Sequence, residues 1–389
     1  MKNVISDKVL GLQPSGIRKF FDIVSEMDDV ISLGVGEPDF DTPWHIRDEG
    51  IYSLEKGRTF YTSNAGLKDL RQEICNTIRR KQGVSYDWQH EVLVTVGGSE
   101  AIDIGLRAMC NPGDEVLIPQ PSYVSYVPCT ILADGNPVVI PLQQKNEFKL
   151  TAEELEAAIT PKTKMLVMPF PNNPTGSIMT KEDLEPIAEV VKRHDLYVLS
   201  DEIYSELTYK TEHVSISSLP GMKERTLVIN GFSKGFAMTG WRLGYLCAPV
   251  GIIQACVRVH QYTVTCASSF VQEAAITALT DCADDVEAMR KEYQRRKDYV
   301  VKALNEIDGI SCNNPHGAFY IFVNIKSLGM TSMEVAEYLL DNAKIALVPG
   351  SAFGSEGEGY LRISYACSYE ELQEACARIK KAVEELKNK

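Results

Sequence analysis

The chain has 389 residues, with 40 Lys and Arg against 53 Asp and Glu, which gives a formal net charge of −13. Hydrophobic residues make up 44% and charged residues 24%, a balance that is typical of globular proteins and excludes disordered, collagen-like and coiled-coil chains. The length predicts two or three domains, and the acidic surplus argues against nucleic acid or an anionic membrane as a partner.

Ten cysteines are scattered along the chain, and no two have the Cys-x-x-Cys spacing of a zinc site or a redox pair. We therefore expect reduced, mostly buried thiols and no metal site. The first residues, MKNVISDKVLGLQP, lack the apolar core of a signal peptide. The longest apolar stretch, residues 245–257, is short and is broken by Pro249, Gly251 and Gln254. These features predict a cytoplasmic protein without a membrane anchor.

From about residue 92 to residue 249, short apolar runs alternate with longer amphipathic stretches, which is the pattern of βα units on a mostly parallel sheet. Thr151 with Glu154 and Thr180 with Asp183 have the spacing of helix capping boxes. We expect an α/β fold with a sheet of seven strands. The expected strands are residues 91–96, 114–119, 137–142, 164–170, 196–201, 226–231 and 243–249.

After about residue 285 the pattern changes to a charged helix at 287–307, strands near 319–323 and 360–364, and a final amphipathic helix. This pattern predicts a smaller α+β domain that packs on the first. We expect the N-terminal segment to join the small domain, because it is too short to fold alone. The expected divisions are an N-terminal segment 1–45, a large domain 46–285 and a small domain 286–389.

A glycine-rich turn follows the first expected strand and opens a helix at Gly97-Gly98-Ser99-Glu100. Free backbone N–H groups at such a helix N-terminus bind phosphate, although Gly-Gly-Ser also serves as a plain helix cap. The turn matches neither the dinucleotide-binding fingerprint nor the P-loop.

Polar residues also follow two later strands. Asn173, within residues 171–176, either belongs to a simple turn or presents a rigidly held amide to a phenolate or hydroxyl oxygen. Asp201, in SDEIY, either caps a helix or projects into a ligand crevice as the partner of a protonated ring nitrogen. The motif alone leaves both alternatives open.

Two cationic residues complete the candidate site. Lys234 lies just beyond an apolar run, at the sheet edge where parallel sheets usually bind ligands. A lone Lys is ordinarily a surface residue, but a lysine that bonds to a carbonyl needs a free amine, which burial or a neighbouring cation such as Arg242 provides. Arg362 stands inside an apolar strand, where its fork suits either a carboxylate ligand or a structural salt bridge.

In this order and spacing the motifs resemble the class I/II pyridoxal-phosphate aminotransferases of fold type I, close to the bacterial aspartate and aromatic branch. The resemblance implies a large domain with a mostly parallel seven-stranded sheet, a smaller α+β domain, and pyridoxal 5'-phosphate as the cofactor. It covers nearly the whole chain and is carried by GVGEPDFDTP, YTSNAGLKDLR, VTVGGSEAI, PNNPTG, SDEIY, SKGFAMTGWRLGY, PGSAFG and YLRISYA.

The resemblance implies a role for each matching residue. Lys234 resembles the lysine that bonds covalently to the cofactor and moves the proton, and Asp201 resembles the carboxylate that keeps the ring nitrogen protonated. Asn173 and Tyr204 resemble the pair that hydrogen-bonds the ring 3-oxygen. Tyr123 resembles the aromatic residue that stacks on the cofactor, with a core tyrosine as the alternative.

The resemblance also implies a phosphate site and a substrate site. Tyr61 resembles the tyrosine that reaches the phosphate from the neighbouring subunit, which implies a homodimer. Arg362 resembles the clamp for the substrate α-carboxylate, with Gly36 and Asn173 lining the same end. Gly231 departs from relatives that have a phosphate-binding Ser three residues before the lysine. The expected phosphate ligands within the subunit are the amides of Gly98, Ser99 and Glu100, together with Ser233 and Arg242.

The implied reaction is ping-pong transfer of an amino group from an L-amino acid to a 2-oxo acid such as 2-oxoglutarate. Residues 259–289 contain neither Lys nor Arg for a distal carboxylate, and Ile17 with Phe20 or Phe21 near the entrance would accept aromatic or long side chains. Aspartate, aromatic and acyl-diaminopimelate donors therefore stay open. The alternatives are a C–S β-lyase of the same fold and a non-catalytic regulator that senses the cofactor, which ordinarily carries an added DNA-binding domain.

Overall fold

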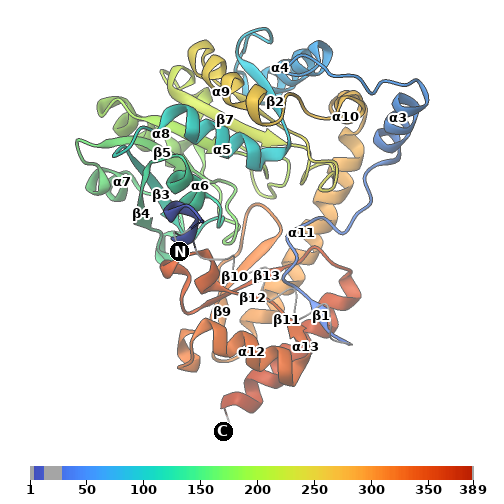
Figure 1. The fold of residues 1–389 in the computed structure, drawn as a ribbon. Helices are drawn as coiled ribbons and strands as arrows, with labels where there is room; N and C mark the ends of the chain where they lie inside the picture. The colour runs from blue at the N-terminus through green and yellow to red at the C-terminus, as the bar shows by residue number, and fades with distance from the viewer. Residues whose placement is uncertain (1–3, 13–28, 388–389) are drawn as a thin grey trace.

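The structure is a computed structural model that describes residues 4–12 and 29–387. Two units are visible in Figure 1, a larger one around a wide sheet and a smaller one below it. The long helix α11 (Ala283–Asn305) runs from the larger unit into the smaller one. This helix corresponds to the charged helix that the sequence predicts.

The large sheet has seven strands in the order β2-β8-β7-β6-β5-β3-β4. β8 is antiparallel to both neighbours and the other pairs are parallel, which confirms a mostly parallel sheet. Most strands are buried on both faces, which explains the continuous apolar runs in the sequence. The strands are β2 (Val92–Thr95), β3 (Glu115–Gln120), β4 (Asn136–Pro141), β5 (Thr163–Met168), β6 (Tyr197–Asp201), β7 (Thr226–Gly231) and β8 (Gly244–Cys247).

Helices cover both faces of this sheet because successive side chains of a strand point to opposite sides. Val116 and Ile118 pack in one core with residues of α5 and α9, whereas Leu117 packs in another core with residues of α7 and α8. The two layers hold the carboxyl ends of the strands in place. The helices of this unit are α3 (Trp44–Glu55), α4 (Lys68–Gln82), α5 (Gly97–Met109), α6 (Tyr126–Leu132), α7 (Ala152–Ala158), α8 (Lys181–Arg193), α9 (Val250–Thr263) and α10 (Ser269–Asp281).

Two of the helices begin at the predicted capping boxes. Thr151 with Glu154 begins α7, and Thr180 with Asp183 begins α8; in each pair both reciprocal hydrogen bonds are present. Each such cap stabilises its helix by about 1 kcal/mol. A third box, which starts at Thr331, was not among the predicted pairs and begins α12 (Ser332–Ala343).

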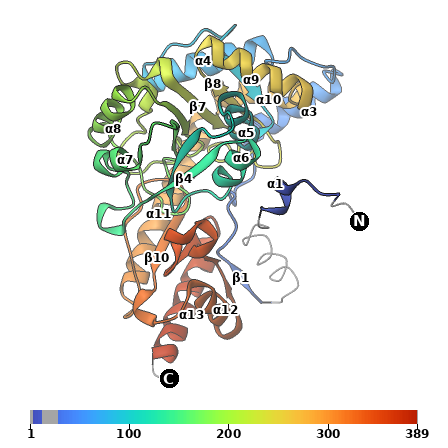
Figure 2. The ribbon, with the colours of Figure 1, turned by 60° about the vertical axis from the view of Figure 1, so that its left-hand side comes forward.

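Segments from early and late in the chain meet in the smaller unit. β1 (Ile31–Ser32) pairs in parallel with β11 (Ile345–Ala346), and Leu33 continues the pairing through hydrogen bonds with Ala346 and Ser364. Figure 2 shows β1 beside the C-terminal helices. The second sheet has the order β12-β13-β10-β9. Its strands are β9 (Ser311–Cys312), β10 (Tyr320–Asn324), β12 (Val348–Pro349) and β13 (Tyr360–Ser364), and α13 (Tyr369–Lys387) ends the described chain.

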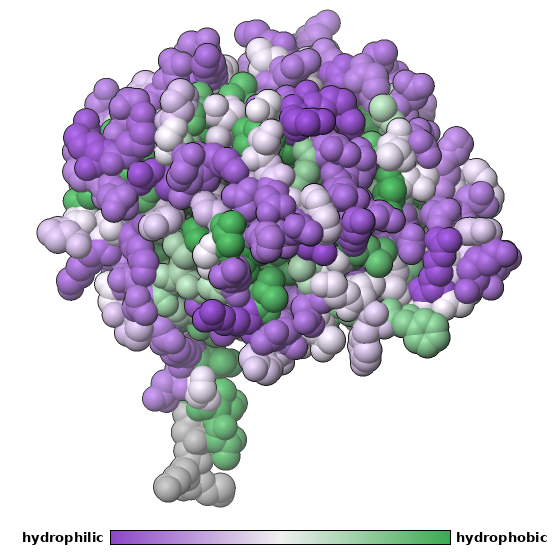
Figure 3. All heavy atoms as spheres, turned by 90° about the horizontal axis from the view of Figure 1, so that it is seen from above, coloured by the Kyte–Doolittle hydropathy of each residue, from purple (hydrophilic) through white to green (hydrophobic). Residues whose placement is uncertain are grey.

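The surface of the larger unit is mostly hydrophilic in the view of Figure 3, with hydrophobic side chains in small groups between the polar ones. The short helix α1 (Asp7–Leu10) lies beside α6, where Lys8 Nζ is 2.5 Å from Asp134 Oδ1. Within residues 4–12 and 29–387, no helix combines the length and the apolar character that crossing a membrane requires. All ten cysteines are free thiols, and the buried ones are Cys247, Cys256, Cys282, Cys312 and Cys376.

Candidate active site

A cavity of about 360 Å³ opens where the carboxyl ends of the large sheet meet the smaller unit. This volume lies in the range of small-molecule sites. All predicted site residues except Glu100 and Tyr61 line the cavity, namely Gly36, Gly98, Ser99, Tyr123, Asn173, Asp201, Tyr204, Ser233, Lys234, Arg242 and Arg362. Ile17, Phe20 and Phe21, which we expected near the entrance, lie outside the described residues.

Lys234 follows β7 and directs its amine into this cavity. Its Nζ donates a hydrogen bond to the carbonyl oxygen of Gly36 at 2.5 Å. Burial lowers the pKa of Lys234 to about 8; the charge of Glu37 opposes that shift, and the charges of Arg362 and Arg242 add to it. Near neutral pH a useful fraction of this lysine is therefore a free amine, which the surface alternative would not provide.

Asp201 ends β6 and is 6% exposed. Tyr126 Oη donates to its Oδ2 at 2.7 Å, and the Ile203 amide donates to Oδ1 at 3.2 Å. Burial raises the pKa of Asp201 to about 6, and these two hydrogen bonds act against that shift. No helix begins at Asp201, so the helix-cap alternative is wrong. The carboxylate is held in place and lacks a cationic partner within ion-pair distance among the residues described.

Tyr126 was not among the predicted site residues, although it lines the cavity. It stands three residues after Tyr123, and the two rings meet edge to face with centroids 5.7 Å apart. The two tyrosines form a Tyr-x-x-Tyr spacing, in which Tyr126 begins α6 and Tyr123 lies just before it. That spacing is the signal by which the sequence could have indicated the second tyrosine.

Asn173 lies within a turn that the Asn172 carbonyl and side chain hold, and it also lines the cavity, so both alternatives for this motif apply. The Asn172 Oδ1 accepts hydrogen bonds from the amide and hydroxyl of Thr175. Asn173 Oδ1 instead accepts from Arg362 Nη1 at 2.9 Å. The Asn173 amide group is thereby oriented beside the cavity, with its nitrogen available to an acceptor.

Tyr204 is 5% exposed and its hydroxyl lies 2.9 Å from the hydroxyl of Tyr320. Tyr320 belongs to β10 of the smaller unit, so this contact joins the two units at the cavity. Tyr320 also lines the cavity. It was not identified from the sequence as a site residue, because it lies within an apolar run that predicts only a strand.

Arg362 is 3% exposed and comes from the middle of β13. Its Nη2 donates to the Gly34 carbonyl at 2.5 Å, and its guanidinium lies over the rings of Tyr320 and Phe353, at 4.4 and 4.9 Å from their centroids. Its Nε is buried without a hydrogen-bond partner. Within the described part of the chain no carboxylate pairs with Arg362, so the salt-bridge alternative is wrong and an anionic ligand fits this residue.

The opposite end of the cavity is built by the N-terminus of α5. A Cβ at Gly97, where φ is +80°, would lie 2.6 Å from Arg242 Nη2, and a Cβ at Gly244 would lie 2.7 Å from the Gly98 nitrogen. Glycine therefore lets the first turn of α5 approach both Arg242 and β8. Helix N-termini with free amides bind anions, and the guanidinium adds a positive charge. Ser233 is buried and lines the same cavity.

Glu100 is in the first turn of α5 but is not among the residues that line the cavity. Its side chain turns back, with Oε2 accepting from the Val96 amide at 2.5 Å and Oε1 lying 2.6 Å from His260 Nδ1.

The glycine at position 231, where some relatives have a serine, has a physical explanation. A Cβ there would lie 3.0 Å from both Gly244 Cα and the Leu243 carbonyl oxygen, so a serine would require β7 and β8 to separate.

Tyr61 lies outside the cavity of its own subunit. It is 86% exposed, and its neighbour Phe60 is 83% exposed, in the segment between α3 and α4. Among the residues described, no group of three His, Cys, Asp or Glu side chains could hold a metal ion.

The residues present fit pyridoxal phosphate. Arg242 and the N-terminus of α5 fit a phosphate, the buried Asp201 carboxylate fits a protonated ring nitrogen, and Lys234 supplies an amine for an aldehyde. The unpartnered Nε of Arg362 leaves a donor for a carboxylate at the other end. The cavity thus offers each chemical group of the cofactor and of an amino acid a complementary side chain.

The comparisons agree over the whole chain. The sequence model of the family described as aminotransferase class I and II matches residues 28–379. The putative aminotransferase YugH of Bacillus subtilis is 53% identical, with 98% of each chain covered. An aspartate aminotransferase of Pyrococcus abyssi is 50% identical over 98% of this chain and 99% of its own. The solved structure of an aromatic aminotransferase from Pyrococcus horikoshii has a TM-score of 0.91 and 48% identity over 95% of this chain and 99% of its own.

Each of these relatives is named an aminotransferase, and none is named a lyase or a regulator. The match includes both units and therefore the whole cavity between them. The chain belongs to the class I and II aminotransferases, and it is a pyridoxal-phosphate-dependent aminotransferase of fold type I.

Proposed function

We propose that the cavity performs amino-group transfer with Lys234, Asp201 and Tyr204 as its catalytic residues. The observation that carries this proposal is the presence of a low-pKa amine, a buried carboxylate and an anion-binding helix N-terminus in one cavity. The residues that would hold the cofactor are the amides of Gly98, Ser99 and Glu100, with Tyr123, Asn173, Asp201, Tyr204, Ser233, Lys234 and Arg242.

The protein residues have separate tasks in this reaction. When bound, pyridoxal phosphate supplies an electrophilic aldehyde carbon and a protonated ring that withdraws electrons from the α-carbon of the donor. Lys234 Nζ takes the proton from that α-carbon and returns it, for which a pKa near the working pH is suited. Asp201 keeps the ring nitrogen protonated. Tyr204 and Asn173 donate hydrogen bonds to the ring 3-oxygen.

Arg362, Asn173 and Gly36 would bind the α-carboxylate of the substrate. The fork of Arg362 is already oriented by Asn173 Oδ1 and the Gly34 carbonyl, so little side-chain entropy is lost on binding. Gly36 is required next to it, because a Cβ there would lie 2.8 Å from the hydroxyl of Tyr320.

We propose aspartate, aromatic and acyl-diaminopimelate-like amino acids as the donor classes, with a 2-oxo acid such as 2-oxoglutarate as acceptor. The relatives named above include an aspartate and an aromatic aminotransferase, and a further one from Bacillus subtilis is named as a probable N-acetyl-LL-diaminopimelate aminotransferase. Among the described residues that line the cavity, the cations are Lys234, Arg242 and Arg362, and each already has a role. This supports neutral aromatic or acyl side chains at least as strongly as a second carboxylate.

Incubation of the enzyme with each donor class tests this function. With 2-oxoglutarate present, at least one of aspartate, phenylalanine and N-acetyl-LL-diaminopimelate should give continuous glutamate formation. Without an acceptor, each subunit should release about one equivalent of 2-oxo acid and then stop, because a ping-pong enzyme needs the second substrate to regenerate. Continuous release of pyruvate and ammonia from cystathionine without an acceptor would instead identify a β-lyase.

We also propose that two subunits form a homodimer in which Tyr61 reaches the phosphate of the neighbouring site. The support is the exposure of large apolar side chains on α3, in the segment after α3 and near the end of α9, since exposed apolar groups of this kind mark protein interfaces. These side chains are Trp44, Ile51, Tyr52, Leu54, Phe60, Tyr61 and Tyr262.

A complementation experiment tests the contribution of Tyr61 across the interface. Tyr61→Ala should weaken cofactor binding about tenfold, the value of one hydrogen bond to a charged group. In a mixed dimer of Tyr61→Ala and Lys234→Ala subunits, one site carries both changes and the other carries neither. With pyridoxal phosphate held near the wild-type dissociation constant, such a dimer should therefore show about half of the wild-type activity, whereas a Tyr61 that served its own subunit would leave no intact site.

We further propose the divisions 1–45, 46–285 and 286–389 as the N-terminal segment, the large domain and the small domain. The pairing of β1 with β11 and the bonds of Leu33 to Ala346 and Ser364 support assignment of the N-terminal segment to the small domain.

A further inference from the structure

A second buried carboxylate, Glu202, directly follows Asp201. Successive residues of an extended chain point to opposite faces, so Glu202 lies behind the cavity. It is 3% exposed. Its Oε1 accepts from Ser200 Oγ at 2.9 Å and from Ser215 Oγ at 2.6 Å, and its Oε2 lies 3.0 Å from His213 Nε2. The reaction described above uses none of these groups.

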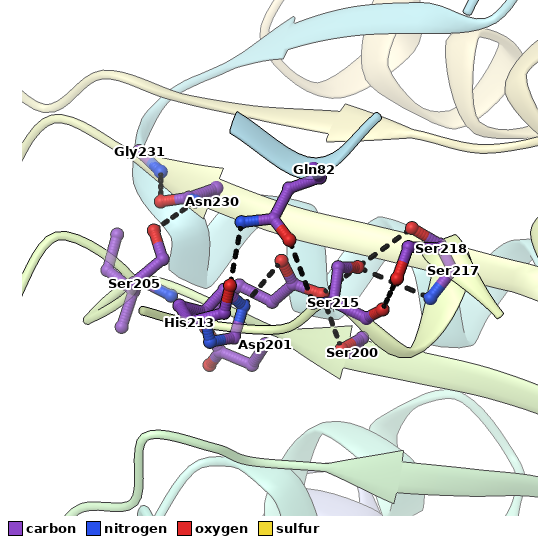
Figure 4. A network of polar contacts seen from close by, with 12 residues as sticks. Gln82, Ser200, Asp201, Ser205, His213, Ser215, Ser217, Ser218, Asn230 and Gly231 are labelled. Atoms are coloured by element: carbon purple, nitrogen blue, oxygen red, sulfur yellow. Dashed lines mark hydrogen bonds and ion pairs between the residues drawn. The ribbon is translucent and has the colours of Figure 1, made fainter. Parts of the chain in front are cut away.

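The hydrogen bonds around Glu202 tie three segments together. Figure 4 shows Ser200 of β6 near His213 and Ser215, with Gln82 from the end of α4 beside them. Gln82 Nε2 donates to the His213 carbonyl at 3.2 Å, and Gln82 Oε1 accepts from the Ser215 amide at 3.0 Å. The backbone amide of Glu202 donates to the Ile229 carbonyl of β7 at 2.8 Å. The backbone next to Asp201 is therefore fixed on both sides.

The charge of Glu202 needs a positive partner, because a buried lone carboxylate is unfavourable. Among the described residues, His213 alone lies within ion-pair distance of it, and the His213 side chain is 8% exposed. On its other side His213 faces a groove, whose charged and titratable lining residues are Arg80, Lys81, Glu206, Tyr209, Lys210, Glu212, Glu287 and Arg290. The charge of Glu202 also raises the pKa values of four further groups, namely Asp201, Tyr86, Tyr245 and Cys247.

We propose that Glu202 and His213 are a positioning pair for the aminotransferase reaction, in which protonated His213 neutralises Glu202 so that Asp201 keeps its own negative charge for the cofactor ring nitrogen. This inference rests on the role proposed for Asp201. Two adjacent buried carboxylates oppose each other's ionisation. Burial is the largest cause that raises the pKa of Asp201, and two hydrogen bonds lower it. The charge of Glu202 is a further, smaller cause that raises this pKa.

The test uses the affinity of the apoprotein for pyridoxal phosphate, measured by tryptophan fluorescence titration between pH 5 and pH 8.5. A protonated Asp201 cannot pair with a protonated ring nitrogen, so affinity should fall as the pH falls through the pKa of Asp201, which is about 6. The midpoint of this fall in affinity reports the ionisation of Asp201. The phosphate and Lys234 also titrate, but they do so in every variant, so their contributions cancel when the midpoints of two variants are compared.

His213→Gln keeps a hydrogen-bond donor for Glu202 but removes the positive charge. The unpaired Glu202 should then raise the pKa of Asp201, so the midpoint should move up by about one pH unit. Removing the negative charge as well, in the H213Q/E202Q double variant, should return the midpoint to the wild-type value. Glu202→Gln alone should leave the midpoint at or below that value. Glu212→Gln, an exposed charge change next to His213, is the matched control and should change nothing.

A wild-type midpoint in His213→Gln, or an equal upward shift in the double variant, would overturn the inference, because a purely structural role does not depend on the sign of the removed charge. Asp201→Asn separates this failure from failure of the proposed function. If Asp201→Asn keeps wild-type affinity at all pH values, the role of Asp201 is wrong. If it loses affinity at least tenfold while His213→Gln keeps the wild-type midpoint, only the positioning pair is wrong.

Discussion

Lys234→Ala protein is expected to lose at least about 10⁴-fold in kcat with every amino donor, since both the covalent bond and the proton transfer depend on this one amine. Arg242 and the N-terminus of α5 remain in the variant, so pyridoxal phosphate should still bind without a covalent bond. Product formation measures the first effect, and retention of the cofactor after gel filtration measures the second.

Lys210→Ala provides the matched control for this result. Lys210 is exposed and lies outside the cavity, so its removal should leave kcat within about twofold of the wild type. Turnover of donors by Lys234→Ala at the normal rate would show that another group carries the chemistry.

Arg362→Lys is expected to lower kcat/KM for amino-acid donors by about 10²- to 10³-fold. The loss follows from replacing a fork, which Asn173 and Gly34 orient and whose Nε is free, with a single ammonium that cannot make two parallel bonds. The measurement compares each donor with the amine that lacks its α-carboxylate. Only the amino acid should be affected, because the amine makes no contact that Arg362 would lose.

Arg378→Lys is the control for that experiment. Arg378 lies on α13 and donates to Glu374 at the surface, so the same exchange there should leave kcat/KM unchanged. An equal loss for the amino acid and for its decarboxylated amine would mean that Arg362 shapes the cavity but does not bind the carboxylate.

Much of the large sheet could be predicted because its strands are buried on both faces, which leaves apolar runs bounded by turns. The site residues Asn173, Asp201 and Lys234 could be placed for a related reason, since each lies at the end of such a run or within five residues after it. The sequence also marked two of the capping boxes, whose hydrogen bonds span only three residues.

Contacts between distant segments could not be predicted. Tyr126 donates to a carboxylate 75 positions away, and the Tyr204 hydroxyl meets that of Tyr320 at a separation of 116. The sequence near each tyrosine does not show which distant residue its hydroxyl meets. The motif around Asp201 could not show whether this residue caps a helix or faces a ligand. The answer depends on whether the chain after β6 forms a turn or a helix.

The segment that follows β1 has a mechanical consequence for Lys234. Leu33 is bonded to β11 and β13 of the smaller unit, and three residues later the Gly36 carbonyl accepts a hydrogen bond from the Lys234 amine of the larger unit. Such a bond favours the charged amine. A rotation of the smaller unit would change both this hydrogen bond and the burial that lowers the pKa of Lys234, so the basicity of the amine depends on how the two units are placed.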